Sequence, residues 1–189
     1  MTELWLVRHG QTDWNIEGRW QGHADIPLNL TGLEQARRLA AKLAETGQAF
    51  QAIFSSDLKR AFQTAQEIGK SLGLPVHKDR RLREISKGEW EGMLVSQVST
   101  LSTEAIRQRR DDPLYSRAPG GESLVEVAAR LSSAADDISR AYPVGPVLVV
   151  THGLALAALL CLANKWPLQE AYDRVPGNAA AQAIHWQVK

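Results

Sequence analysis

Three apolar segments of this sequence end in polar residues that could bind or attack an anion. The polar residues are, in chain order, Arg8 and His9, then Ser55 to Asp57 followed by Arg60, then Thr151 and His152. A neutral histidine can act as a nucleophile or carry a proton, and arginine offers the planar, bidentate grip that suits phosphate. Two arginines and two histidines brought together would therefore form a cationic pocket for a small, highly charged anion such as phosphate.

The apolar segments themselves are the elements that would position these side chains. Residues 4–7, 52–54 and 146–150 are continuous apolar runs, typical of strands covered on both faces. Helical patterns separate the runs, which predicts an α/β sandwich with a largely parallel sheet. Ligands of open parallel sheets bind beyond the carboxyl ends of the strands. If the three strands are parallel neighbours, the two arginines and two histidines converge in one crevice.

The helices between the strands are expected to begin at recognisable caps. Thr31 and Glu34 form a capping-box pattern that opens a helix ending near Gly47. Ser55 to Asp57 are suited to cap the next helix, which Gly73 closes. Further elements are expected as a short strand around Val76, a helix from Glu122 to Tyr142 and an edge strand from Ala181 to Val188.

Arg60 falls in the first turn of the second predicted helix, where the helix dipole disfavours a cation. This placement favours a ligand clamp, because an anion beside Arg60 would offset the penalty. The alternative interpretation is a surface arginine that pairs with Asp57.

Residues 87–118 do not fit the alternation of strands and helices. Pro113, Pro119 and adjacent glycines interrupt any periodicity there, which predicts a lid or insert within a single domain spanning residues 1–189. The arginines at positions 107, 109, 110 and 117 could grip a second anionic group or simply solvate a helix. The neighbouring Asp111 and Asp112 favour the second interpretation.

The composition restricts the possible partners. The formal net charge of +1 gives no global attraction for nucleic acid or an anionic membrane, so any attraction for an anion must be local. No signal-peptide pattern opens the chain and no apolar run is long enough to cross a bilayer. Cys161, the only cysteine, cannot form an intrachain disulfide and is expected to be buried. These features predict a cytoplasmic protein.

The remaining histidines and the tryptophans match no catalytic pattern. His23 follows Gly22 and could touch a ligand, but a solvent-exposed or structural role is favoured for it and for His77 and His185. The six tryptophans form no stripe that would serve as a stacking platform for nucleic acid. No His-Glu-x-x-His helix or dense Cys/His cluster is present, so a metallohydrolase is disfavoured and no metal is expected.

Four motifs, in this order, resemble those of the histidine phosphatase superfamily, which includes cofactor-dependent phosphoglycerate mutases and many phosphomonoesterases. The resemblance spans Leu4 to His152 and is carried by "LVRHGQTDWN", "SSDLKRAFQTA", "LREISKGEWEG" and "VTHG". It implies a three-layer α/β/α fold with a mostly parallel central sheet of the phosphoglycerate mutase type. It also implies a site at the carboxyl ends of the strands and chemistry without a cofactor.

The resemblance further implies roles for individual residues. His9 matches the nucleophile that forms a phosphohistidine, and Glu84 matches the general acid, which must hold a proton near neutral pH. Glu89 and Glu91 are the neighbouring competitors for that role. The phosphate ligands of the family match Arg8, Asn15, Arg60 and His152, with His152 grouped among the catalytic residues, and Gln21 and Gly22 are candidates to approach phosphate through backbone N–H groups.

Hydrolysis is favoured over mutase activity. Mutases typically read Glu-Arg-His-Tyr-Gly where this chain reads Glu84-Ile85-Ser86-Lys87-Gly88, and Leu154 replaces their asparagine. We therefore expect a phosphomonoesterase acting on small phosphorylated metabolites. Phosphoglycerate mutase and phosphohistidine-protein phosphatase are the alternatives. A non-enzymatic phospho-ligand-binding protein is disfavoured because His9, Glu84 and His152 are all present. The oligomeric state stays open.

Overall fold

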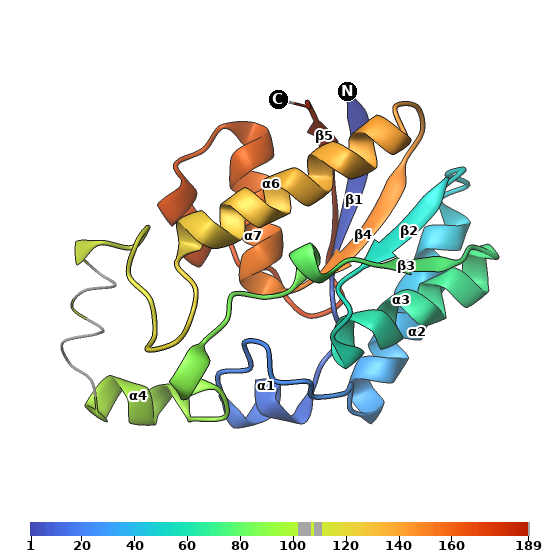
Figure 1. Cartoon of the computed structure of the whole chain (residues 1–189). Helices are drawn as coiled ribbons and strands as arrows, with labels where there is room; N and C mark the ends of the chain where they lie inside the picture. The colour runs from blue at the N-terminus through green and yellow to red at the C-terminus, as the bar shows by residue number, and fades with distance from the viewer. Residues whose placement is uncertain (102–106, 108–110, 189) are drawn as a thin grey trace.

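A five-stranded sheet forms the centre of the molecule (Figure 1). The computed structural model describes residues 1–101, 107 and 111–188. In spatial order the strands are β3 (Val76–Lys78), β2 (Ala52–Ser55), β4 (Val147–Thr151), β1 (Thr2–Arg8) and β5 (Ala181–Trp186). The first four are mutually parallel and β5 runs antiparallel to β1. The predicted mostly parallel sheet, with its edge strand near the C-terminus, is confirmed.

The register of the sheet aligns the ends of its three central strands. Arg8 at the end of β1 pairs with Thr151 at the end of β4, and Ser55 at the end of β2 pairs with Val150. Because β4 lies between the other two, all three carboxyl ends meet at one edge. The prediction that these strands are parallel neighbours is confirmed.

Helices cover both faces of the sheet (Figure 1). On one face, α2 (Leu30–Glu45) and α3 (Lys59–Leu72) pack on Val7, Ile53 and other side chains that point toward them. On the opposite face, α6 (Leu124–Ala141) and α7 (Gly153–Asn164) pack on the alternate strand residues, among them Leu6 and Val149, and enclose Cys161. Both faces are apolar because the sheet is buried between the two layers, which confirms the three-layer α/β/α architecture.

Shorter elements connect these layers. They are α1 (Asp13–Glu17), η1 (Arg80–Leu82), η2 (Gly88–Trp90), α4 (Val95–Leu101) and η3 (Leu168–Tyr172).

Among the described residues no helix is both long and apolar enough to cross a membrane.

The predicted cap of α2 is wrong. Asn29, rather than Thr31, is the N-cap, and its side-chain oxygen accepts a hydrogen bond from the backbone N–H of Gly32 at 2.8 Å. The helix begins at Leu30, so Thr31 already lies inside the first turn and is exposed. An asparagine side chain is as good a cap as threonine, and the sequence offered both within three residues.

The predicted cap of α3 is also wrong. Leu58 occupies the N-cap and makes no side-chain cap hydrogen bond. A distant carboxylate caps the helix instead, because Asp25 Oδ1 accepts from the backbone N–H of Lys59 at 2.6 Å. Of the three expected cap residues, Asp57 forms a bidentate ion pair with Arg83 instead.

Two glycines allow α2 to approach the end of β1. A Cβ on Gly32 would lie 2.0 Å from the carbonyl oxygen of Gln11, and a Cβ on Gly10 would lie 2.4 Å from that of Gly32. Backbone atoms form both obstacles, so neither could move aside like the end of a flexible side chain. The segment after β1 is therefore held against the first turn of α2.

We expect Gly32→Ala to lower the free energy of unfolding by about 1–3 kcal/mol, the usual cost of overpacking. The better helix propensity of alanine offsets at most about 1 kcal/mol of this cost. Gly177→Ala is the matched control, because a Cβ there meets nothing within 4 Å. Urea unfolding of both variants measures the difference, and equal stabilities would contradict the close-approach argument.

Candidate active site

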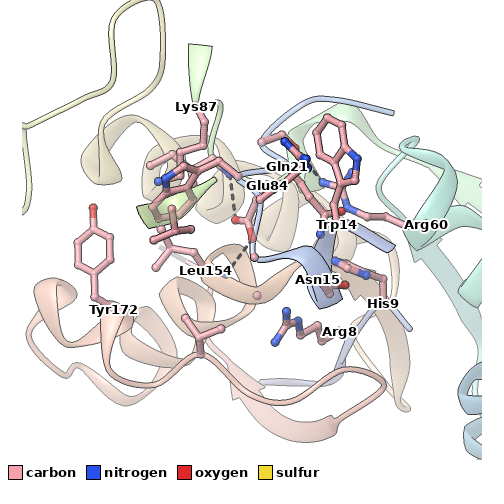
Figure 2. A pocket seen from close by; sticks show the side chains of 18 of the residues that line it. Arg8, His9, Trp14, Asn15, Gln21, Arg60, Glu84, Lys87, Leu154 and Tyr172 are labelled. Atoms are coloured by element: carbon pink, nitrogen blue, oxygen red, sulfur yellow. Dashed lines mark hydrogen bonds between the residues drawn. The ribbon is translucent and has the colours of Figure 1, made fainter. Parts of the chain in front are cut away.

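A pocket of about 490 Å³ opens beyond the carboxyl ends of the central strands (Figure 2). Every predicted site residue except His152 lines it. These lining residues are Arg8, His9, Asn15, Gln21, Gly22, Arg60 and Glu84. Of the three candidate carboxylates at positions 84, 89 and 91, all within the described residues, Glu84 alone lines the pocket. The structure thus brings together residues that lie far apart in the chain.

His9 is almost fully buried at the end of β1. Its Nδ1 lies 2.6 Å from the carbonyl oxygen of Gly10. Because a carbonyl can only accept, Nδ1 carries the proton and Nε2 keeps its lone pair. Burial, together with the charges of Arg60 and Arg8, lowers the pKa of His9 well below its usual range, against the opposing effect of the Gly10 hydrogen bond. The ring is therefore neutral at physiological pH.

Arg60, the second residue of α3, is completely buried. Its Nη2 donates to the carbonyl of Gly22 at 2.8 Å, its Nη1 to the carbonyl of Ala24 at 2.7 Å, and its Nε to His152 Nδ1 at 3.2 Å. Burial lowers the pKa of Arg60 to about 10, with the nearby carboxylates, Glu84 foremost, opposing the shift. The guanidinium remains charged at neutral pH, and the alternative of a surface arginine paired with Asp57 is wrong.

His152 lies behind Arg60, outside the pocket lining. Its Nδ1 accepts from Arg60, so Nε2 carries the proton and donates to Ser56 Oγ at 2.8 Å. The centre of its ring is 5.2 Å from that of His9. Burial, followed by the charge of Arg60, lowers the pKa of His152 well below its usual range. His152 is thus a neutral, fixed support for Arg60 and His9.

Arg8 and Asn15 present hydrogen-bond donors to the pocket. Arg8 Nη1 donates to the carbonyl of Pro176, while its buried Nε finds no acceptor among the described residues. Asn15 Oδ1 accepts from the backbone N–H and hydroxyl of Thr12 and from Asn178 Nδ2. With its oxygen engaged in this way, the amide of Asn15 has its Nδ2 donors left for a ligand. Two donor side chains therefore flank His9.

Gly22 occupies a position that only glycine fits. Its φ is +50°, and a Cβ would lie 2.3 Å from Glu91 Oε1 and 2.7 Å from the backbone nitrogen of Lys87. Loop geometry therefore accounts for this glycine, whose carbonyl accepts from Arg60. The adjacent Gln21 is nearly buried, and its Oε1 has no partner among the described residues.

Glu84 is anchored at the N-terminus of α7 (Figure 2). Its Oε2 accepts from the backbone N–H of Leu154 at 3.0 Å, and its Oε1 accepts from those of Ala155 at 3.1 Å and Ile85 at 3.0 Å. Backbone N–H groups at the start of a helix have no partner within the helix, and the carboxyl oxygens of Glu84 supply acceptors for them. Glu91 instead holds a loop, with Oε1 accepting from the backbone N–H of His23 at 2.8 Å.

A family model for the histidine phosphatase superfamily (branch 1) matches residues 4–189. This chain belongs to that superfamily. It is 34% identical over 187 residues to phosphoserine phosphatase 1 of Hydrogenobacter thermophilus, covering 99% of this chain and 88% of that protein. It is 39% identical over 159 residues to phosphoglycerate mutase-like protein 4 of Arabidopsis thaliana, covering 83% of this chain and 69% of that protein.

Solved structures of this superfamily share the fold. A mycobacterial glucosyl-3-phosphoglycerate phosphatase, in complex with VO3, superposes with a TM-score of 0.89 at 34% sequence identity, covering 98% of this chain and 93% of that one. The resemblance inferred from the four motifs is confirmed, and the chain is an enzyme of the histidine phosphatase superfamily.

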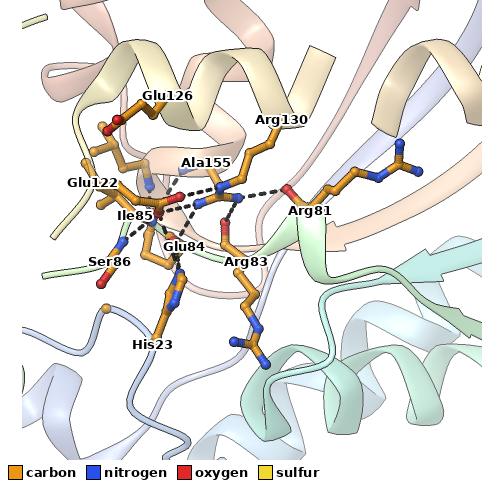
Figure 3. A network of polar contacts seen from close by, with 12 residues as sticks. His23, Arg81, Arg83, Glu84, Ile85, Ser86, Glu122, Glu126, Arg130 and Ala155 are labelled. Atoms are coloured by element: carbon orange, nitrogen blue, oxygen red, sulfur yellow. Dashed lines mark hydrogen bonds and ion pairs between the residues drawn. The ribbon is translucent and has the colours of Figure 1, made fainter. Parts of the chain in front are cut away.

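A polar network that the sequence did not predict holds Glu84 in place (Figure 3). Arg130 on α6 donates to the carbonyls of Arg81 and Arg83 at 2.7 Å and to that of Glu84 at 2.8 Å. Its guanidinium also pairs with Glu122, whose Oε2 accepts from the backbone N–H of Ser86 at 2.9 Å. One arginine thus fixes the whole segment that carries Glu84.

The loop before β5 was missed as well. Asn178 Nδ2 donates to the carbonyl of His9 at 3.2 Å and to Asn15 Oδ1 at 3.3 Å, and the backbone N–H of Ala179 also donates to the His9 carbonyl. No local motif marks these residues, since they act through partners more than 160 positions away. The antiparallel pairing of β5 with β1 brings them to the end of β1, against the backbone of His9.

The predicted lid contributes little of the described pocket wall. Lys87 is 8% exposed and places its ammonium 4.4 Å from the centre of the Trp20 ring, and Val95 lies beside them in the lining. Arg117 pairs with Glu126 at 3.1 Å on the surface and Arg107 is exposed, while Arg109 and Arg110 lie outside the described residues. The described residues contain no group of three or more His, Cys, Asp or Glu side chains arranged to hold a metal ion.

The lowered pKa values of His9 and His152 predict a stability that falls in acid. Below the ordinary histidine pKa of 6.5, these two histidines become protonated in the unfolded chain but stay neutral in the native protein. The free energy of unfolding therefore decreases as pH falls toward the native pKa values. Each histidine adds at most about 1.4 kcal/mol per pH unit. We expect His9→Gln to show a shallower decline than the unsubstituted protein in urea unfolding below pH 6.5. Exposed His77→Gln is the control, and identical slopes in all three proteins would contradict the assignment.

We expect Arg130→Met to lower the free energy of unfolding by about 2–4 kcal/mol, because it strands three carbonyls and Glu122. Arg140→Met is the matched control on the same helix, where the ion pairs are exposed and contribute little. Thermal and urea unfolding measure both variants. Comparable effects of the two substitutions would refute the special place of Arg130.

Proposed function

We propose that this chain is a phosphomonoesterase that hydrolyses small phosphorylated metabolites through a phosphohistidine on His9, with Glu84 as general acid. The state of His9 carries this proposal. Its proton is held on Nδ1 by the Gly10 carbonyl, its pKa is lowered by burial and by two arginines, and its Nε2 lone pair is left for the pocket. A neutral imidazole nitrogen beside cationic donors suits attack on a phosphoryl group.

In the first proposed step, Nε2 of His9 forms a bond to phosphorus as the bond between phosphorus and the ester oxygen breaks. The departing oxygen takes a proton from Glu84, so the alcohol leaves neutral and Glu84 becomes a carboxylate. The N–H groups of Ile85, Leu154 and Ala155 accommodate that negative charge.

In the second step, water attacks phosphorus while the bond between nitrogen and phosphorus breaks. Glu84 takes a proton from this water, which restores its acid form, and inorganic phosphate and neutral His9 remain. Splitting a very slow hydrolysis into two positioned steps lowers the barrier of each.

Arginine and amide donors stabilise the phosphoryl charge in this scheme, so we propose that no metal ion is needed. Arg8 offers its guanidinium, Asn15 its Nδ2 and Arg60 its charge. His152 acts through Arg60 and His9 rather than on the substrate, because it lies behind both. Gln21 and Gly22 form the rim of the phosphate site.

The relatives support hydrolysis without excluding phosphoryl transfer. Two of them are named as phosphatases, for phosphoserine and for glucosyl-3-phosphoglycerate, and one as phosphoglycerate mutase-like. Ile85 and Ser86 follow Glu84 in this chain, where mutases carry an arginine and a histidine that could hold a second charged group. This difference favours a phosphatase, with phosphoglycerate mutase and phosphohistidine-protein phosphatase as the alternatives.

The test is hydrolysis of p-nitrophenyl phosphate in excess chelator, comparing the unsubstituted protein with His9→Ala. We expect activity to survive chelation and to fall about 10³-fold or more in the variant, since a lost nucleophile is rarely replaced. Rapid alkaline quenching should trap phosphate on His9 in the unsubstituted protein only. Activity that requires added metal, or that persists in His9→Ala, would overturn the proposal, and isomerisation of a phosphoglycerate without phosphate release would favour the mutase.

A further inference from the structure

Three consecutive residues, Gly22, His23 and Ala24, lie between the phosphate site and the proton donor. We call them the 22–24 strap. The carbonyls of Gly22 and Ala24 accept hydrogen bonds from Arg60 at 2.8 and 2.7 Å. His23 is the residue between Gly22 and Ala24 in the sequence, and its Nε2 lies 2.8 Å from the carbonyl oxygen of Glu84. The strap is therefore hydrogen-bonded to Arg60 through its backbone and to Glu84 through the side chain of His23.

The strap has a fixed conformation. A turn closes it, with the backbone N–H of Ala24 donating to the carbonyl of Gln21 at 2.9 Å. The positive φ of Gly22 bends the chain beneath Glu91, whose Oε1 accepts from the backbone N–H of His23 at 2.8 Å. A shift of Arg60 or of Glu84 is thus resisted by the strap and passed on to the other residue.

The hydrogen at His23 Nε2 is assigned by its partner. A carbonyl oxygen can only accept, so Nε2 carries a proton and donates to the Glu84 carbonyl. The same carbonyl accepts from Arg130 Nη2 at 2.8 Å, and Glu122 Oε2 lies 3.6 Å from His23 Nε2 (Figure 3). Arg130 and Glu122 belong to the α6 side of the molecule, whereas His23 is the contact that reaches Glu84 from the phosphate side.

We propose that His23 is a positioning residue, which keeps Glu84 in line with the phosphoryl group that Arg60 holds. The inference rests on the proposed roles of Glu84 and Arg60. Proton transfer to the departing oxygen requires the acid and the bound phosphoryl group to keep a fixed separation, and small displacements are costly. Residues 83–87 form no helix or strand with β1 or α3, so the strap supplies a direct link between acid and clamp.

The experiment compares phenyl phosphate with p-nitrophenyl phosphate, which are similar in size but differ in the basicity of the leaving group. The value of kcat/KM reports steps up to formation of the phosphoenzyme. Loss of proton donation lowers it for phenyl phosphate, whose leaving group needs a proton, far more than for p-nitrophenyl phosphate. A merely structural defect lowers it for both.

His23→Met and His23→Gln form a matched pair, because both keep a long side chain and only glutamine retains an N–H donor. We expect His23→Met to lower kcat/KM for phenyl phosphate about 10-fold or more and to change the p-nitrophenyl value much less, as for partial loss of a general acid. His23→Gln should recover most of the activity, and exposed His77→Met should match the unsubstituted protein. Thermal unfolding checks each protein, and His23→Ala replaces His23→Met if the latter does not fold.

A double-mutant cycle decides whether His23 acts through Glu84. In a Glu84→Gln background, His23→Met should have no further selective effect, because the proton it helps to place is gone. A uniform loss on both substrates, or an equal selective loss in the Glu84→Gln background, would overturn the role of His23 and leave the proposed function intact. If Glu84→Gln itself shows no selective loss on phenyl phosphate, Glu84 is not the general acid, and the inference falls with that part of the proposed function.

Discussion

Parallel pairing of β1 with β4 is the constraint on which the rest of the site depends. It sets Arg8 opposite Thr151, so the residues that follow, His9 and His152, leave the sheet side by side with ring centres 5.2 Å apart. Both strands are covered by helices on each face, and a sheet buried in this way does not adjust its register without exposing its core. The antiparallel strand β5 begins at the same edge, and just before it Asn178 donates a hydrogen bond to the carbonyl of His9.

The positive charge of the pocket depends on which residues the nearby carboxylates pair with. Among the described residues, the hydrogen-bond acceptors of Arg60 are two carbonyls and a neutral histidine, not a carboxylate. Asp57, the acid nearest to Arg60 in the sequence, is engaged instead by Arg83, which lowers the pKa of that carboxyl. The buried charge of Arg60 is therefore solvated by dipoles and left for an anionic ligand. Burial, followed by the same charge, lowers the pKa of both histidines and keeps them neutral.

Strand ends could be predicted from the sequence because their signals are local. An apolar run that stops at Arg8-His9 or Thr151-His152 places those residues at a sheet edge whatever the rest of the chain does. Helix caps proved less predictable, because the choice is decided by small differences and by partners elsewhere. The N-cap of α2 is Asn29, two positions before the expected Thr31. The carboxylate that caps α3 is Asp25, in a loop more than thirty residues away. The roles of Arg130 and Asn178 could not be predicted from the sequence. The carbonyls that Arg130 binds lie 46 to 49 residues away, and the partners of Asn178 lie 163 and 169 residues away.

The proposed nucleophile and the proposed proton donor are held by different kinds of structure. His9 continues a strand, and its backbone N–H donates to the carbonyl of Thr151, so the sheet directly fixes its backbone. Glu84 lies in a segment without regular structure, and its place is the sum of contacts from α7 to its carboxylate and from Arg130 and His23 to its carbonyl. A disturbance of α6 can therefore displace Glu84 through Arg130 while the residues around His9 stay in place. In the proposed mechanism, capture of a phosphoryl group and protonation of its leaving group therefore depend on different parts of the fold.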